Sequence, residues 1–191
     1  MKKLLGPVLV LFALPAFAGD INYNYLELGY QQIDFDEDIL PGFDINGNGY
    51  SIAGSFELGE SVFIAGGYSQ ADLDFGVKAD TLSLGVGYHV GLSDNVDFYG
   101  TLSAVRVEAS ISGFGSEDED GYGAEIGVRG MIGERFELSG SLGYVDLGDG
   151  ADGTEVGAGL QYYISDAFSI GLTLDVDEDV TAYGAGIRLY F

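Results

Sequence analysis

Acidic side chains are the main chemical resource of this sequence. Its 191 residues include 31 Asp and Glu against 7 Lys and Arg, a formal charge of −24 at pH 7. His89 is the one histidine and no serine has an identifiable base, so the residues predict neither an enzyme nor a catalytic site. The absence of cysteine excludes disulfides, cysteine metal sites and thiol catalysis. No cofactor is expected, and nucleic acid is not an expected partner because phosphate binding needs clustered Lys and Arg.

Three acidic clusters are candidates for loose binding of divalent cations. Their central members are Asp36, Glu37 and Asp38; Glu117, Asp118 and Glu119; and Asp177, Glu178 and Asp179. A solvated, self-repelling surface is the first interpretation. Weak bridging by Ca²⁺ or Mg²⁺ to anionic lipopolysaccharide is the alternative. Residues 44–49 begin like an EF-hand loop, but Ser55 stands where the loop needs Glu and a strand follows, so no dedicated metal site is predicted.

The N-terminus has the pattern of an export signal. Lys2 and Lys3 precede an uncharged apolar stretch over 4–14, and Ala16 and Ala18 form an A-x-A cleavage site. We therefore expect a cleaved signal peptide over 1–18 and one mature domain over 19–191. The composition is 47% hydrophobic and 13% aromatic, which excludes simple disorder of the mature chain.

Alternation of apolar and small polar residues predicts strands almost everywhere after residue 19. In 81–90, for example, Leu82, Leu84 and Val86 fall on one face, and Ser83 and Gly85 on the other. Ten segments have about the length that a tilted strand needs to cross a bilayer. They are 22–33, 48–58, 61–70, 80–91, 95–108, 121–132, 135–146, 154–164, 167–176 and 181–191. The alternation slips near Ala104 and Val105, which predicts a bulge.

The connections between these segments alternate in kind. Tight turns are expected at 59–60, 92–94, 133–134 and 165–166. Longer, acidic loops are expected at 34–47, 71–79, 109–120 and 147–153, with a short acidic one at 177–180, and Lys78 is the one base among them. Short turns at one end and longer loops at the other are typical of an outer-membrane β-barrel. The fold prediction is an all-β, antiparallel, up-and-down transmembrane barrel of about ten strands, with eight as the alternative.

In such a barrel the apolar face contacts lipid and the small polar face lines the lumen. Aromatic residues near the strand ends would form two girdles at the membrane surfaces. One girdle would comprise Tyr25, Phe56, Tyr88, Phe98, Phe136, Phe168 and Phe191, and the other Tyr30, Tyr50, Tyr68, Tyr122 and Tyr144.

Eight charged residues fall on the lumen face, namely Glu27, Glu57, Asp97, Glu125, Arg129, Glu137, Glu155 and Arg188. A tight turn at 133–134 would bring Arg129 opposite Glu137. Closure of the barrel by its first and last strands could bring Arg188 near Glu27. A plug of paired charges is the favoured interpretation, and a narrow cation-preferring path is the alternative. His89 is expected in the lumen near the end that carries the tight turns.

The signal pattern, the hairpin layout and the last six residues resemble the small outer-membrane β-barrel family of OmpA/OmpX-like "porin family" proteins. The resemblance covers essentially the whole mature chain. It implies that Gly186, Leu189 and Phe191 form the C-terminal signal read by the barrel-assembly machinery. The family usually has a polar residue seven positions before the end, where this sequence has Gly184. Periplasmic chaperones during biogenesis, outer-membrane lipid and lipopolysaccharide are the further partners it implies. The expected location is the bacterial outer membrane, and the expected state is a monomer.

The sequence therefore predicts an outer-membrane barrel with acidic surface loops and a structural or surface-interaction role. A narrow, cation-preferring, porin-like channel is the alternative function.

Overall fold

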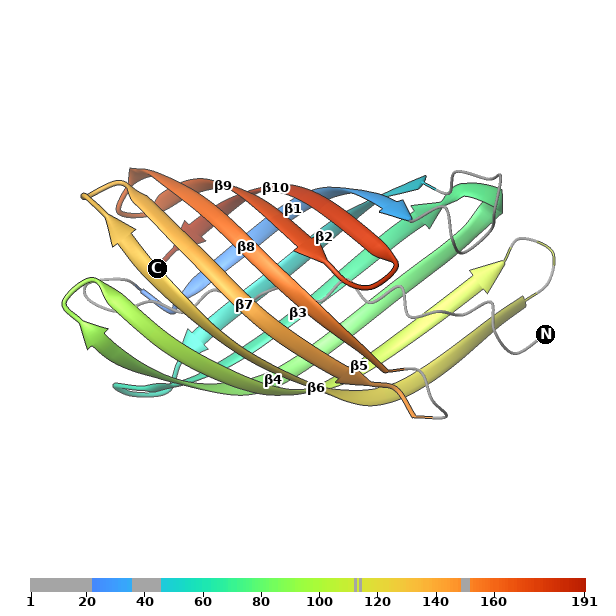
Figure 1. Ribbon diagram of the computed structural model, residues 1–191, viewed down its shortest axis with the longest axis horizontal. Coiled ribbons are helices and arrows are strands. Elements are labelled where there is room, and N and C mark those ends of the chain that lie inside the picture. The colour runs from blue at the N-terminus through green and yellow to red at the C-terminus, as the bar shows by residue number, and fades with distance from the viewer. Residues whose placement is uncertain (1–21, 36–45, 112, 114, 149–151) are drawn as a thin grey trace.

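A computed structural model describes residues 22–35, 46–111, 113, 115–148 and 152–191. Ten antiparallel strands form a closed barrel in which each strand pairs with its neighbours in the chain and β1 pairs with β10 (Figure 1). The strands are β1 (Tyr25–Phe35), β2 (Asn46–Glu57), β3 (Val62–Leu73), β4 (Val77–Ser93), β5 (Val96–Ile111), β6 (Gly115–Ile132), β7 (Phe136–Asp146), β8 (Asp152–Ser165), β9 (Phe168–Val176) and β10 (Val180–Tyr190). The predicted fold is confirmed, with ten strands rather than eight.

The start of the first strand and the end of the last strand lie together at one rim of the barrel. Tyr25 at the start of β1 pairs with Tyr190 at the end of β10. This rim, the terminal end, also carries the tight turns β2–β3, β4–β5, β6–β7 and β8–β9, and it lies on the left in Figure 1. The opposite rim is the distal end. The predicted signal peptide, and residues 36–45 of the first predicted loop, lie outside the described residues.

Two predicted loops at the distal end are wrong, because most of their residues continue strands. β3 and β4 pair as far as Leu73 and Val77, around a 3-10 turn η1 (Asp74–Gly76). β5 and β6 pair as far as Ile111 and Gly115. The acidic residues 117–120 therefore lie on an exposed part of β6, where charged side chains stay in water while the backbone keeps its ladder. Among the described residues, 115–121 of β6 pair with β5 alone, because pairing with β7 starts at Tyr122.

The predicted bulge near Ala104 and Val105 is also wrong. β5 keeps continuous register there with both β4 and β6. Ala104 points outward, and Val105 points inward against Val145 and Leu147. The sequence pattern is interrupted because Val105 places an apolar side chain on the inner face, and no residue is inserted into the strand. The register shifts of the barrel fall instead near the turns, between Gly91 and Ser93 and between Tyr163 and Ser165.

The outer surface is apolar, as expected for a barrel in lipid. On β4, Leu82, Leu84, Val86 and Tyr88 are between 50% and 67% exposed. The five tyrosines of the second predicted girdle are all exposed. In the first girdle Tyr25 is wrong, because its ring points into the barrel and is 1% exposed; Phe168 is half-buried. The described residues contain no helix that is both long and apolar enough to cross a membrane.

The distal half of the interior contains apolar clusters, although small polar residues were expected to line the lumen. One comprises Ile33, Ala71, Ala79, Val180 and Ala182. Another comprises Val105, Val145 and Leu147. The charged side chains of the interior therefore gather in the middle and toward the terminal end.

Candidate functional site

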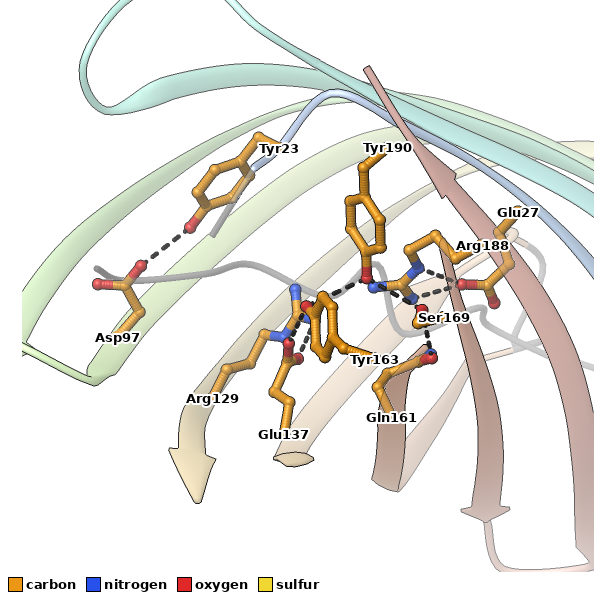
Figure 2. Close-up of polar contacts among 10 residues, drawn as sticks. All are labelled: Tyr23, Glu27, Asp97, Arg129, Glu137, Gln161, Tyr163, Ser169, Arg188 and Tyr190. Atoms are coloured by element: carbon orange, nitrogen blue, oxygen red, sulfur yellow. Dashed lines mark hydrogen bonds and ion pairs between the residues drawn. The ribbon is translucent and has the colours of Figure 1, made fainter. Parts of the chain in front are cut away.

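Two buried arginines lie in the terminal half of the interior. Arg129 on β6 forms an ion pair with Glu137 on β7, and Arg188 on β10 forms one with Glu27 on β1 (Figure 2). Both arginines are 1% exposed. The register brings Glu27 directly opposite Arg188, and Glu137 opposite Met131, two residues from Arg129. Both predicted pairs are thus present, and each joins neighbouring strands.

Tyrosine hydroxyls connect these ion pairs into one hydrogen-bonded network (Figure 2). The Tyr163 hydroxyl donates to Glu137 at 2.8 Å, and the Tyr190 hydroxyl donates to that of Tyr163 at 3.1 Å. Ser169 lies 3.2 Å from the Tyr190 hydroxyl and donates to the Gln161 side chain at 3.1 Å. The network therefore runs from β7 through β8 and β9 to β10. The alternation over 154–164 predicts an inward Tyr163, on the same face as Glu155 and Gln161, but no role in a network was predicted for either tyrosine.

Aromatic rings fill the space around the arginines. The Arg188 guanidinium lies 4.3 Å from the centre of the Tyr25 ring, within cation–π range. The rings of Phe63 and Tyr99 lie over glycines on the strands opposite, Gly87 and Gly127, where a Cβ atom would overlap them. Glycine on the neighbouring strand therefore leaves the space that each ring occupies inside the barrel.

His89 sits in a second polar group at the terminal end, as predicted. Its Nε2 atom lies 3.3 Å from Glu57, and its Nδ1 atom 3.5 Å from Asp97. The Tyr23 ring stacks on the imidazole with centroids 3.9 Å apart, and its hydroxyl donates to Asp97 at 3.3 Å (Figure 2). The Asp97 side chain is fully buried, whereas Glu57 is 26% exposed.

Three carboxylates lie in the middle of the barrel. Glu125 and Glu155, both predicted on the lumen face, are 7% and 5% exposed. The Tyr99 side chain is buried and lies beside Glu125. Asp175 on β9 shares this region and interacts with Glu125 through space. It was not among the eight predicted lumen charges, but it continues the inward series Ser169, Gly171 and Thr173.

The acidic candidates for divalent binding are spread along the distal end. Asp36, Glu37 and Asp38 lie outside the described residues. Among the residues that are described, no group of three or more His, Cys, Asp or Glu side chains is arranged to hold a metal ion. Asp118 and Asp120 both pair with Arg106, a base that the predicted loops did not include. Lys78 pairs with Asp72 at 2.6 Å. Loose cation binding by Glu117, Asp118, Glu119, Asp177, Glu178 and Asp179 stays a prediction.

The residues of the predicted assembly signal lie in β10 and just after its end, and they point to different faces. Leu189 and Phe191 point outward and are 48% and 68% exposed. Gly186 lies on the inner face and pairs with Gly29 and Gly171.

Comparison with known proteins agrees with this architecture. The family model described as "Outer membrane protein beta-barrel domain" matches residues 6–163. The chain belongs to this outer-membrane β-barrel family. Membership confirms the resemblance found in the sequence and assigns the protein to the barrels of the bacterial outer membrane. The match ends within β8, so β9 and β10 complete the barrel beyond it.

Several solved barrels of low identity are similar to this family member. The KdgM porin in complex with disordered oligogalacturonate has 10% identity and a TM-score of 0.49, with 87% of this chain and 99% of that chain covered. Neisserial surface protein A has 15% identity and a TM-score of 0.46, with 87% and 96% covered. The attachment invasion locus protein Ail of Yersinia pestis has 16% identity and a TM-score of 0.47, with 90% and 100% covered. No curated protein matches the chain.

Proposed function

We propose that this protein is a closed outer-membrane barrel that presents an acidic surface at its distal end, with a structural or surface-interaction role. The packing of the terminal half of the interior carries the proposal. Arg129 and Arg188 are 1% exposed, and so are the rings of Tyr23, Tyr25 and Tyr99. Paired charges and stacked rings occupy the terminal half of the interior, where a diffusion pore would need water.

The distribution of charge supports a surface role for the distal end. Described acids at this end are Asp34, Asp72, Asp74, Asp80, Glu108, Glu117, Asp118, Glu119, Asp120, Asp146, Asp152, Asp177, Glu178 and Asp179. Lys78 and Arg106 are the bases among them, and each is already paired with an acid. Barrels of this class place short turns in the periplasm, so the distal end would face the exterior. Its partners would then be lipopolysaccharide bridged by divalent cations, or cationic molecules.

Biogenesis by the barrel-assembly machinery belongs to the same proposal. The exposed side chains of Leu189 and Phe191 would be available to that machinery before the strand inserts. Periplasmic chaperones would keep the apolar outer face soluble until then. We expect the inserted protein to be a monomer that is not an enzyme.

A narrow cation-preferring path is the second candidate function. It is favoured by the three carboxylates in the middle of the interior, Glu125, Glu155 and Asp175. Arg129 attracts Glu125 electrostatically, but its ion pair is with Glu137, so this region keeps a negative charge. A path of this kind would have to pass the arginines and tyrosines of the terminal half.

Conductance in planar bilayers tests the two candidates against each other. We expect the purified wild-type barrel to be silent and the Arg129→Ala/Arg188→Ala double variant to give small steps, because two large side chains leave the plug. Arg106→Ala is the matched control, since it removes an arginine from the exposed distal end. Reproducible cation-selective steps from the wild type that weaken in Glu27→Gln and Glu125→Gln would reject the closed barrel in favour of the path.

A further inference from the structure

Residues 22–24, which precede β1, cross the mouth of the barrel at the terminal end. The neighbours of β1 in the wall are β2 and β10. The Tyr23 side chain instead contacts β3, β4 and β5. Its ring lies 4.8 Å from that of Phe63 and 3.9 Å from that of His89, and its hydroxyl donates to Asp97 at 3.3 Å. A residue that continued along the wall could not reach strands that lie two to four places away.

Two asparagines fix the segment on either side of this ring. The Asn22 side-chain amide donates to the carbonyl of Phe191 at 2.6 Å, and its Oδ1 atom accepts from the Asn24 backbone amide at 2.8 Å. The Asn24 Oδ1 atom accepts from the backbone amide of Glu57 at 3.1 Å. The Phe191 amide donates to the Asn24 carbonyl at 3.0 Å. The segment is therefore fastened to the ends of β2 and β10, while Tyr23 reaches inward between them.

We propose that residues 22–24 form an N-terminal clasp that closes the terminal end and controls access to the group formed by His89, Glu57 and Asp97. The clasp lies outside the strands, so it can leave without breaking any ladder between them. The contacts that hold it include the ring stacks of Tyr23 on His89 and Phe63, the Tyr23 hydrogen bond to Asp97, and the hydrogen bonds of Asn22 and Asn24. When Tyr23 leaves, the imidazole loses its stacked ring and the buried Asp97 carboxylate loses a donor.

The accessibility of position 89 tests this clasp directly. The chain has no cysteine, so His89→Cys gives a single thiol whose rate of labelling by a small charged methanethiosulfonate reports opening. We expect labelling to be slow with Tyr23 present. His89→Cys removes the imidazole, so Tyr23 is held there by its stack on Phe63 and its hydrogen bond to Asp97. Labelling should be at least about tenfold faster with Tyr23→Ala, which loses both of these contacts. Tyr23→Phe keeps the ring and should cause a smaller rise, about threefold.

Two further variants keep the test decisive. Asp94→Cys puts a thiol on the exposed turn between β4 and β5, and its labelling should not depend on residue 23. If Tyr23→Ala fails to fold, Asn22→Ala/Asn24→Ala loosens the clasp without entering the interior and should also speed labelling of position 89. Equal rates at position 89 in all folded backgrounds, judged by the heat-modifiable band, would overturn the clasp.

The inference goes beyond the proposed closed barrel and can fail separately from it. Conduction by the wild-type protein would contradict the closed interior and leave the ratio of labelling rates unchanged. A Tyr23-independent labelling rate in a silent barrel would contradict the clasp alone.

Discussion

Arg129 on β6 and Glu137 on β7 form an ion pair whose side chains are 0% and 1% exposed. Breaking a buried pair by removing one partner is strongly destabilising, because an uncompensated charge stays behind. We expect Glu137→Gln to lower the free energy of unfolding by about 3–5 kcal/mol. Urea unfolding in phospholipid vesicles, followed by loss of the heat-modifiable band, measures the change.

Replacing both members of this pair should cost less than removing one. Arg129→Met/Glu137→Leu leaves no unpaired charge between β6 and β7, so its stability should lie between that of the wild type and that of Glu137→Gln. Glu119→Gln, on the exposed part of β6, is the control and should change the unfolding midpoint little. A single variant no less stable than the double one would show that the pair does not hold the plug together.

A methyl group added at the glycines beneath Phe63 and Tyr99 should destabilise the barrel, because it forces the rings to shift. Gly87→Ala and Gly127→Ala each place a Cβ atom within the ring above, and overpacking of this kind costs about 1–3 kcal/mol. Gly140→Ala is the control, because a Cβ atom there would lie 3.9 Å from the Gly157 carbonyl oxygen, an ordinary van der Waals contact. The measurement is again urea unfolding, and equal midpoints for Gly87→Ala and Gly140→Ala would contradict the packing.

A positive charge at position 188 should not be enough for full stability without the planar guanidinium of arginine. Its Nε and Nη2 atoms both contact one oxygen of Glu27, and its plane lies over the Tyr25 ring. Lysine keeps the charge but loses the planar fork. Arg188→Lys should therefore lower the free energy of unfolding by about 1–2 kcal/mol. Arg106→Lys, at an exposed ion pair, should change it by less than about 1 kcal/mol.

Asp177 gives the turn between β9 and β10 a dependence on pH. Burial raises the pKa of its carboxyl above the ordinary value, although hydrogen bonds from the backbone amides of Asp179 and Val180 act against the rise. A carboxyl with a raised pKa in the folded state favours folding below its unfolded pKa, and that contribution is lost as pH rises through the folded pKa.

Asp177→Asn keeps the side-chain acceptor for both amides and removes the charge. We expect this variant to gain stability relative to the wild type between pH 4 and pH 8, as the wild-type carboxyl ionises. Urea midpoints at pH 4, 6 and 8 measure it. A constant difference between the two proteins over this range would show that the carboxyl does not titrate against folding.

Alternation in the sequence predicted the strands and their faces because a residue's face depends on local spacing alone. It also predicted both ion pairs, since Arg129 and Glu137 flank one tight turn and closure pairs the first strand with the last. The predicted distal loops at 71–79 and 109–120 are wrong because charged side chains do not end a strand that extends into water. The exposed acids of 117–120 show that a ladder continues into water when its neighbour continues beside it.

The inward aromatic rings were predicted only in part. Tyr25 resembles a girdle residue by composition and position, but it belongs to the same inward series as Glu27, Gly29 and Gln31, so the alternation of β1 itself predicts an inward ring. Tyr23 lies before the first strand, so no periodicity describes it. Its contacts with Phe63, His89 and Asp97 arise from the three-dimensional path of the segment.

The one-sided pairing of β6 has a consequence for molecules crowded together in a membrane. Among the described residues, 115–121 of β6 pair with β5 alone, and a strand edge of this kind can template the addition of a strand from another copy. Here the edge carries Glu117, Asp118, Glu119 and Asp120 in succession, and Arg106 pairs with Asp118 and Asp120. Four acids against one base leave the edge negative, so two copies that approach edge to edge would repel each other instead of zipping into a fibre.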